Sequence, residues 1–326
     1  MIQPRFQPFL PRAALERLAR DRGLPSTQRA DLAHALRVDA QIRRVRSENA
    51  RLASLMQGLP DQSIPAARPA IEIYRCGHGT ALPGLHLDNP ARSRDVAARN
   101  AFRKTEQVIA FYREVFYRNS LDDAAKTLIS SVHYSVHYAN AFWTGTQMVY
   151  GDGDGEVFTG FTEADDVIAH ELIHGVTQYS AGLGYVNQSG ALNESLSDVF
   201  GVMFRHWQQR EESAVADWRI GATILGPLAR SRGYSCLRDL ADPAAVHCLT
   251  PQPSRYAQYR DGMDPHEGSG IANHAFFLAA TGLGGPSWET AGRIWYHAMT
   301  AYAPNPALRM RAVCKSTHSQ GRVRCV

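Results

Sequence analysis

The sequence lacks several features that define large classes of protein. No apolar run approaches the ~18 residues of a membrane-spanning helix, so we expect no membrane span. The first residues, MIQPRFQPFLPRAAL, contain no hydrophobic segment of the kind found in conventional secretory signals. No Cys-x-x-Cys pair occurs, which argues against a zinc ribbon or a thioredoxin-type site. With 44% apolar residues, the 326-residue chain can still bury a large core, and wholesale disorder is excluded.

Cysteine is scarce and odd in number. Because the chain has five cysteines, at least one thiol stays free or pairs between molecules. Cys236 and Cys248 are close enough in sequence to close a loop. A disulfide between them and two free thiols both fit the sequence.

Lysine is scarce as well, and arginine carries most of the positive charge. The net charge of +4 is unevenly spread. Residues 1–60 carry eleven Arg against five acids, and residues 309–326 carry five cations and no acid, which leaves −7 for residues 61–308. Nucleic-acid binders present one continuous basic face, so this distribution argues against a nucleic-acid partner. The basic head could instead dock on the acidic body.

Residues 1–60 predict a small helical segment. Aliphatic residues recur at spacings near three, four and seven between positions 32 and 55, and Gly23, Pro25 and Ser26 divide a short first helix from a longer second one. Residues 61–70 are predicted to be a Pro-containing linker. Because the segment is too small for a strong core of its own, we expect it to pack on the rest of the chain.

The remaining chain divides into a strand-rich part and a helical part. Strands are predicted at 71–75, 127–135 and 146–150, with a helix at 96–118. Thr162 and Asp165 resemble a capping box for a helix that ends near Tyr179. Further helices are predicted at 191–208, 270–282 and 287–301. We therefore predict an α+β fold with an N-terminal domain over 71–176 and an α-helical domain over 177–326, whose tail from 303 to 326 is atypical.

A metal-binding pattern lies within the helix that ends near Tyr179. His170, Glu171 and His174 form His-Glu-x-x-His, which places the two imidazoles one turn apart on one helical face. Such a pair can bind one zinc ion, while the Glu171 carboxylate is free to take a proton from an attacking water. The pattern arises by chance in roughly two per cent of chains of this composition, so a third ligand is needed to support it.

Two acidic residues follow at a useful spacing. Glu194 lies twenty residues beyond His174 and could complete the zinc site, with Asp198 one turn further on the same helical face. Asp198 could accept the free ring N–H of a ligand histidine and so fix its tautomer. The metzincin Gly-x-x-His and the inverted His-x-x-Glu-His are both missing. A solvated acidic helix face is the alternative interpretation of Glu194 and Asp198.

The stretch HELIHGVTQYSAGLGYVNQSGALNESLSD (170–198) resembles the active-site stretch of the thermolysin family of neutral metalloproteases. NAFW (140–143) and QMVYGDGDG (147–155) are similar to that family's substrate-edge strand, and SGIANHAFFLAA (269–280) is similar to its C-terminal helical segment. FQPFLP (6–11) resembles a short signature in the propeptide of the protealysin subgroup. The resemblance covers about residues 71–300. It implies a two-domain zincin with a β-rich N-terminal lobe, a mainly α-helical C-terminal lobe, the active-site helix between them and a small helical propeptide in front.

The resemblance also implies a role for each matching residue. The zinc ligands would be His170, His174 and Glu194, supported by Asp198 and Asn193. The catalytic groups would be Glu171 as general base, Tyr185 and His266 as oxyanion donors, and Asp261 to orient His266, with Asp264 as a competitor for that last role. The substrate backbone would be held by Asn140, Ala141, Trp143 and Arg238. Cleavage before bulky hydrophobic residues is implied by an apolar pocket formed by Phe158, Phe161, Val167, Ile220 and Leu237.

One metal site of the family is not expected here. Asp166 and Asp217 match carboxylates of the family's double calcium site, whereas Arg205, Arg219 and Ala222 stand where the resemblance implies acids. Two cations and the loss of three carboxylates would repel Ca²⁺, so we expect no calcium at that site.

These observations predict a zinc endopeptidase that acts on peptide or protein substrates and is made as a zymogen. Secretion is implied by the resemblance, although the missing secretory signal leaves cytoplasmic retention open. The alternative function is a catalytically silent binding protein on the same scaffold, kept inactive by its prosegment or by its altered C-terminus.

Overall fold

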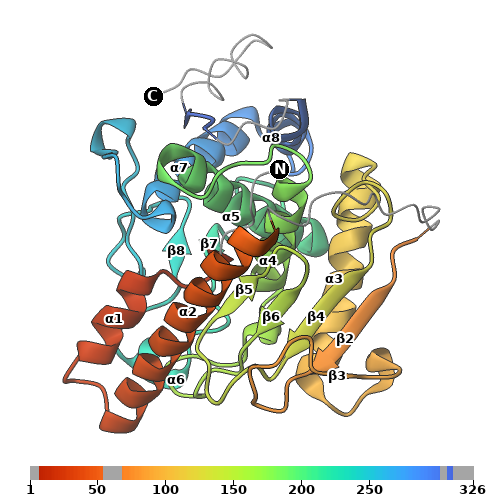
Figure 1. Cartoon of the computed structure of the whole chain (residues 1–326). Helices are drawn as coiled ribbons and strands as arrows, with labels where there is room; N and C mark the ends of the chain where they lie inside the picture. The colour runs from red at the N-terminus through yellow and green to blue at the C-terminus, as the bar shows by residue number, and fades with distance from the viewer. Residues whose placement is uncertain (1–6, 54–67, 302–306, 311–326) are drawn as a thin grey trace.

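The structure is a computed structural model that describes residues 7–53, 68–301 and 307–310 of the chain (Figure 1). Most of the predicted linker at 61–70 and most of the tail from 303 to 326 lie outside the described residues. Among the helices of the described ranges, none combines the length and the apolar character that a bilayer span requires.

The head consists of a two-residue strand and two helices. Strand β1 (Gln7–Pro8) precedes helix α1 (Arg12–Arg20), and helix α2 covers Ser26–Ala53. The break between the helices falls at the predicted turn around Gly23. The two helices pack side by side (Figure 1), and α1 turns its apolar residues inward.

A six-stranded mixed sheet forms the N-terminal lobe. Its order is β1-β5-β6-β4-β2-β3. Besides β1, the strands are β2 (Ile71–Arg75), β3 (Leu85–His86), β4 (Leu128–Val132), β5 (Ala141–Trp143) and β6 (Met148–Tyr150). Strands β2, β4 and β6 run parallel, whereas β5 is antiparallel to both β6 and β1. The head therefore adds a strand to the edge of the body's sheet, which the sequence did not predict.

Two long helices lie near this sheet. Helix α3 (Val96–Phe116) begins with a cap in which the Asp95 carboxylate accepts a hydrogen bond from Ala98 N at 3.0 Å. Helix α4 (Asp165–Gln178) carries the His-Glu-x-x-His pattern. The predicted capping box at its start was wrong, because Thr162 belongs to a separate 3₁₀ turn, η2 (Phe161–Glu163), and the N-cap, Ala164, makes no side-chain bond.

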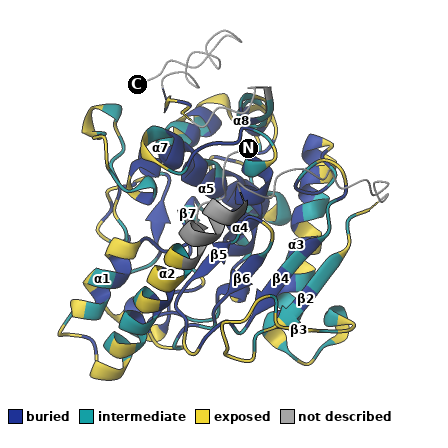
Figure 2. Cartoon of the chain, in the orientation of Figure 1, coloured by how far each residue is buried: buried dark blue, intermediate teal, exposed yellow. Residues whose placement is uncertain are grey.

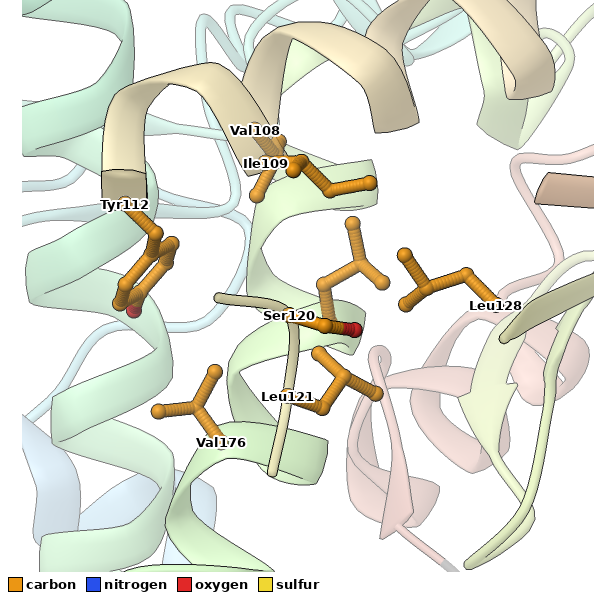
Figure 3. A pocket seen from close by; sticks show the side chains of 8 residues that line it. Val108, Ile109, Tyr112, Ser120, Leu121, Leu128 and Val176 are labelled. Atoms are coloured by element: carbon orange, nitrogen blue, oxygen red, sulfur yellow. The ribbon is translucent and has the colours of Figure 1, made fainter. Parts of the chain in front are cut away.

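Helix α4 is buried over most of its length (Figure 2). Its Leu172 and Val176 face a small apolar cavity (Figure 3). The cavity is also lined by residues of α3, the following loop and β4: Val108, Ile109, Tyr112, Ser120, Leu121 and Leu128. His170 and His174 precede Leu172 and Val176 by two positions, about 200° around the helix, so they point the opposite way. Core packing thus fixes the face of α4 that carries Leu172 and Val176, while the imidazoles of His170 and His174 project from the opposite face.

The second lobe is mainly helical, and its elements after α4 are short strands and helices arranged around α5. They are α5 (Asn187–Gln209), β7 (Arg219–Ile220), α6 (Pro227–Ser231), β8 (Arg238–Asp239), η3 (Tyr256–Gln258), α7 (Pro265–Leu283) and α8 (Thr290–Ala301). The first lobe also contains a short 3₁₀ helix, η1 (Pro90–Arg92). Helix α5 packs against both α4 and α7. One apolar core runs through both lobes, where for example Phe116 of α3 stacks on Tyr296 of α8 at 4.4 Å. The predicted α+β class, sheet-rich first and helical second, is confirmed.

Candidate active site

Two facing helices bring the three predicted zinc ligands together. His170 and His174 project from α4 and Glu194 from α5, and all three are buried. Nε2 of His170 lies 3.3 Å from Oε2 of Glu194, and Nε2 of His174 lies 3.4 Å from Oε1. A tetrahedral zinc site with bonds of about 2.0–2.1 Å has ligand-to-ligand edges of about 3.3 Å, so these spacings suit one ion.

The donor atoms at this point are otherwise unused. Nε2 of His170, Nε2 of His174 and Oε2 of Glu194 are buried and have no hydrogen-bond partner in the described part of the chain. Buried polar atoms without partners are costly, and three of them converging indicates a cation between them. Two imidazoles and one carboxylate are also the donor set of catalytic zinc sites that keep a position open. The residues present therefore fit a zinc ion.

The second nitrogen of each imidazole is held from behind. Nδ1 of His170 lies 3.0 Å from Oδ1 of Asp198. Nδ1 of His174 lies 2.8 Å from Oδ1 of Asn193 and 3.1 Å from Oγ of Ser197. These contacts set the tautomer and aim Nε2 of each ring at the metal position. Asp198 and Asn193 were predicted, whereas Ser197 belongs to no motif and was missed.

Asp198 joins the metal-binding residue His170 to Arg238. Arg238 donates two hydrogen bonds to it, from Nε at 2.8 Å and from Nη2 at 2.7 Å, and Asn273 donates a third at 2.9 Å. Burial alone would raise the pKa of Asp198, but Arg238 and His170 lower it to about 2. The anionic carboxylate fixes the Arg238 fork in one orientation. Asn273 was not predicted, although it lies within the motif at 269–280, one turn beyond its start.

The two glutamates of the site have opposite electrostatic surroundings. Burial alone would raise the pKa of Glu194, but the imidazoles of His266, His174 and His170 hold it well below its usual value. Burial raises the pKa of Glu171 to about 8, although the imidazoles of His170 and His266 and a backbone hydrogen bond from Trp143 oppose the shift. Glu194 thus suits a metal ligand, and Glu171 suits a group that exchanges a proton.

Tyr185 and His266 border the metal position through their contacts with Glu194. The Tyr185 hydroxyl donates to Oε1 of Glu194 at 2.5 Å, and Nε2 of His266 lies 3.4 Å from Oε2. Burial lowers the pKa of His266, but the negative charges of Glu194 and Asp264 outweigh it and raise the pKa. Two hydrogen-bond donors therefore lie close to the point at which negative charge would develop during acyl transfer.

The partner of His266 differs from the one expected. Nδ1 of His266 lies 2.9 Å from Oδ1 of Asp264, and the same oxygen accepts from the His266 backbone N–H. Asp261 is exposed and makes no hydrogen bond to His266. The prediction for Asp261 was wrong because α7 starts at Pro265, so the Asp264 carboxylate, as its N-cap, folds onto the first turn that holds His266.

The head lies in the cleft as an added strand. Phe9 N donates to the Ala141 carbonyl at 2.8 Å, and Leu10 N donates to Oδ1 of Asn140 at 2.8 Å. Strand β1 pairs with the backbone of β5 up to Trp143. The structure thus brings together the three residues expected to align a peptide backbone, with the head as the aligned peptide.

The head also reaches the catalytic groups. The Pro8 carbonyl oxygen lies 2.6 Å from Nε2 of His266, and Arg238 donates from Nη1 to the Phe9 carbonyl at 3.4 Å. Two consecutive carbonyls of one peptide thus contact the two side chains that were expected to bind substrate carbonyls. The Pro8–Phe9 bond lies where these contacts meet.

The Phe9 ring packs beside Phe161, one of the residues expected to line the apolar pocket. Its centroid lies 4.9 Å from that of the His170 ring and 6.4 Å from that of the Phe161 ring, both in edge-on arrangements. The Arg238 guanidinium lies 5.0 Å from the Phe9 centroid. Phe158 packs on Phe161 at 6.1 Å. The predicted lining is fully buried: Phe158, Phe161, Val167, Ile220 and Leu237. Phe9 belongs to the FQPFLP signature, but its contact with His170 and Phe161 was not predicted.

The ion pairs between head and body differ from the expected docking of a basic head on an acidic body. Two pairs across the head–body interface, Asp21 with Arg232 and Asp31 with His137, have the acid in the head. Arg17 of the head donates to a backbone carbonyl, that of Leu249. Local pairing between head and body therefore does not follow their net charges.

At the position where the resemblance places a double calcium site, arginines pair with the two carboxylates that this chain keeps. Nη1 of Arg205 lies 3.1 Å from Oδ2 of Asp166. Arg219 donates to both oxygens of Asp217, at 2.8 and 3.0 Å. One oxygen of Asp166 and both oxygens of Asp217 are thus bound to guanidinium groups, whereas Oδ1 of Asp166 has no hydrogen-bond partner among the described residues.

We expect calcium to leave stability unchanged. A Ca²⁺ ion at 100 times its dissociation constant would stabilise the fold by about 2.7 kcal/mol. For a protein of this size that corresponds to a Tm increase of several degrees. With zinc present, addition of CaCl₂ should move Tm by less than about 1 °C relative to MgCl₂ at equal ionic strength. A selective rise of several degrees with calcium would contradict this expectation.

The fold and this site together define a two-lobed metallopeptidase, and comparison with known proteins agrees. The profile of the thermolysin metallopeptidase catalytic domain matches residues 85–178, and that of its α-helical domain matches residues 181–316. The chain therefore belongs to the thermolysin metallopeptidase family.

Relatives and solved structures give the same assignment. The chain is 43% identical to an extracellular metalloprotease of Pectobacterium carotovorum subsp. carotovorum, over 73% of this chain and 71% of that protein. It is 38% identical to a thermolysin of Bacillus sp. over 72% of its length, but spans only 44% of that protein. The solved precursor of protealysin, a metalloproteinase from Serratia proteamaculans, superposes with a TM-score of 0.81 at 35% identity, covering 96% of this chain and 92% of that one.

Proposed function

We propose that the chain is a zinc-dependent endopeptidase that cleaves before bulky hydrophobic residues and is kept inactive by its own residues 1–60. The observation that carries the proposal is the seating of Pro8 and Phe9. Their backbone pairs with β5, the Pro8 carbonyl lies within hydrogen-bond distance of His266, and the Phe9 ring packs against Phe161 and His170. A peptide bound in this way has the contacts of a substrate, and it also excludes other substrates.

The chemistry divides among the residues as follows. A bound zinc ion, held by His170, His174 and Glu194, would supply Lewis-acid polarisation of the scissile carbonyl and a lower pKa for water at the site. Glu171 takes the proton of the attacking water and returns it to the leaving nitrogen. Its burial, which raises its pKa to about 8, suits that exchange.

The developing oxyanion would be stabilised by Tyr185 and His266. His266 is already within hydrogen-bond distance of a peptide carbonyl, that of Pro8. Asp264 holds its Nδ1, which keeps Nε2 directed at the substrate. Removal of one such donor typically costs about 10²–10³ in kcat. On this account Arg238 binds the carbonyl of the residue after the scissile bond, as it binds that of Phe9. Asn140 accepts a hydrogen bond from the backbone N–H of the next residue, as it does from Leu10.

Peptide hydrolysis tests the proposed function directly. We expect casein and a furylacryloyl dipeptide to be cleaved after the head is removed, and a zinc chelator such as 1,10-phenanthroline to abolish cleavage. Added zinc should restore it. N-terminal sequencing of the products should show bulky hydrophobic residues at the new amino termini. A processed, zinc-loaded chain that cleaves neither substrate would favour the alternative, a silent binding protein, which these comparisons do not support.

A buried carboxylate ties the head to the cleft. Asp39 of α2 is fully buried, and it accepts from Tyr138 Oη at 2.5 Å and from Asn140 Nδ2 at 3.2 Å. The same Asn140 side chain binds Leu10 through its oxygen. Burial raises the pKa of Asp39 to about 6 from 3.8, although these hydrogen bonds and Arg43 oppose the shift.

Head docking should therefore weaken as the pH rises. A carboxyl whose pKa is raised on docking favours the docked state when protonated, so docking loses stability between about pH 4 and pH 6, by up to about a hundredfold. Binding of an active-site peptide hydroxamate to the uncleaved chain should become easier over this range. In Asp39→Asn this part of the pH dependence should disappear. Asp21→Asn is the matched control, because a backbone hydrogen bond from Gly23 lowers the pKa of Asp21 and places its titration below the window. Identical profiles for Asp39→Asn and the unmodified chain would refute the assignment.

Export is the localisation that the relatives favour, since the Pectobacterium protein is named as extracellular. Peptides and proteins are the proposed substrates, and residues 1–60 are the proposed intramolecular inhibitor. No nucleic-acid partner is proposed.

A further inference from the structure

We propose that Cys236, His247 and Cys248 form a second metal site, separate from the catalytic one, that takes Zn²⁺ or another divalent ion with affinity for thiolates. The site would be structural and would pin the loop between Cys236 and Cys248. It does not depend on the proposed peptidase function.

The two sulfurs have the spacing of thiolates on one metal ion. Sγ of Cys236 lies 3.6 Å from Sγ of Cys248, and both residues are buried. Two sulfurs at about 2.3 Å from a tetrahedral zinc ion are about 3.8 Å apart. A ring nitrogen of His247 completes a group in which every ligand atom lies within 4.8 Å of the others. The three protein ligands need only small shifts to bind one ion.

A carboxylate supports the histidine in the manner of known metal sites. Oδ2 of Asp239 lies 3.2 Å from Nε2 of His247. Oδ1 of Asp239 is itself held by the backbone N–H groups of Ala241 and Asp242, at 2.8 and 3.3 Å. Histidine ligands commonly have such an outer carboxylate, which orients the ring. The His247 side chain is 38% exposed, so water can reach the fourth position.

The two cysteines are free thiols in a common apolar setting. Cys236 and Cys248 form a small apolar cluster with Ala245, apart from the main core. On metal binding each of the two thiols would release its proton to solvent, so that two thiolates bind the ion.

The backbone holds the two cysteine segments in place without the metal. Leu249 N donates to the Cys236 carbonyl at 2.9 Å, and Ser235 N donates to the His247 carbonyl at 3.0 Å. Arg238 follows Cys236 by two residues. A metal at this point would therefore stiffen the segment that presents Arg238 to the substrate.

A second group of possible metal ligands in the described residues is unsuited to a metal ion, because one of its histidines is already paired at both ring nitrogens. His78, His133 and Asp152 also lie within 4.8 Å of one another. Both ring nitrogens of His133 are already paired with carboxylates, Nδ1 with Asp152 at 2.8 Å and Nε2 with Asp95 at 3.0 Å. Hydrogen bonding to Asp152 raises the pKa of His133 to about 9 against the effect of burial, so the ring keeps its proton. In the described residues neither sulfur of the cysteine site is paired with a carboxylate, since Cys236 contacts Cys248 and the Ser235 side chain.

Cobalt titration of the full-length chain, purified with a phosphine reductant, tests the proposal. We expect two Co²⁺ per chain and a thiolate-to-cobalt charge-transfer band, which the catalytic ligands cannot produce. Cys236→Ser and Cys248→Ser should each lose the band and one equivalent. Asp239→Asn should weaken the second affinity about tenfold. His170→Ala should lose the other equivalent and keep the band, which separates this test from the catalytic site.

Controls address the other thiols and folding. Cys76→Ser should keep the band, as should Cys314→Ser and Cys325→Ser, whose positions lie outside the described residues. His247→Ala, at a partly exposed position, should lose the second equivalent while its thermal melt without added metal equals that of the metal-free unmodified chain, which guards against misfolded cysteine variants. A reduced chain that takes up one metal and keeps the Cys236 and Cys248 thiols free would overturn the proposal. So would a chain whose mass is lower by two hydrogens through a Cys236–Cys248 disulfide and that binds no second metal after reduction.

Discussion

Glu171→Gln should retain the catalytic zinc and lose peptidase activity. Because Glu171 contributes no ligand atom to the group of His170, His174 and Glu194, its replacement leaves the metal donors intact. The amide cannot accept the proton of the attacking water, and loss of a general base typically costs about 10²–10⁴ in rate. We expect kcat to fall by about 10³ or more with metal content unchanged.

The comparison requires matched processing. Both chains should be freed of the head by an unrelated serine protease, since an inactive variant cannot process itself. Glu163→Gln is the matched control, because Glu163 is an exposed acid just before the same helix and should leave kcat unaltered. Near-full activity in Glu171→Gln would show that another group is the base.

Phe9→Ala should release much of the inhibition in the uncleaved chain. The Phe9 ring is fully buried against His170 and Phe161, and removal of a buried Phe side chain typically costs about 3 kcal/mol or more. That corresponds to at least about a hundredfold weaker docking. Hydrolysis of a small peptide by the uncleaved variant should rise at least tenfold, toward the rate of the processed enzyme.

Two controls isolate the effect of the pocket. Arg22→Ala changes an exposed residue of the same head and should keep the low activity of the uncleaved chain. After processing, all three proteins should be equally active, because the changed residue is gone. If uncleaved Phe9→Ala remained as inactive as the unmodified chain while its processed form was active, the head would not inhibit through this pocket.

The sequence carried most of the metal centre because helical spacing determines it. The i and i+4 histidines on α4 and the i and i+4 acids on α5 were predicted from periodicity, and the facing arrangement of the two helices brought His170, Glu194 and Asp198 together. The α+β class followed from the change from alternating to helical patterns after residue 155. These features depend on local rules that a single sequence displays.

The parts that the sequence did not reveal depend on tertiary contacts. His266 is paired with Asp264 and not with Asp261, because the start of α7 decides which carboxylate reaches its ring. Helix starts are set by packing as well as by sequence. Strand β1 is two residues long and exists only because β5 offers it an edge. Asp39 gave no signal of its own, since one acid on a helix reads as exposed until its partners Tyr138 and Asn140 are placed.

The most direct test of the account is the position of zinc in crystals of the processed chain. Anomalous scattering recorded on both sides of the zinc absorption edge locates the ion without reference to activity. The account predicts a full-occupancy peak at about 2.0–2.2 Å from Nε2 of His170, Nε2 of His174 and a carboxylate oxygen of Glu194. A zinc-loaded crystal with no peak between these three side chains would contradict it.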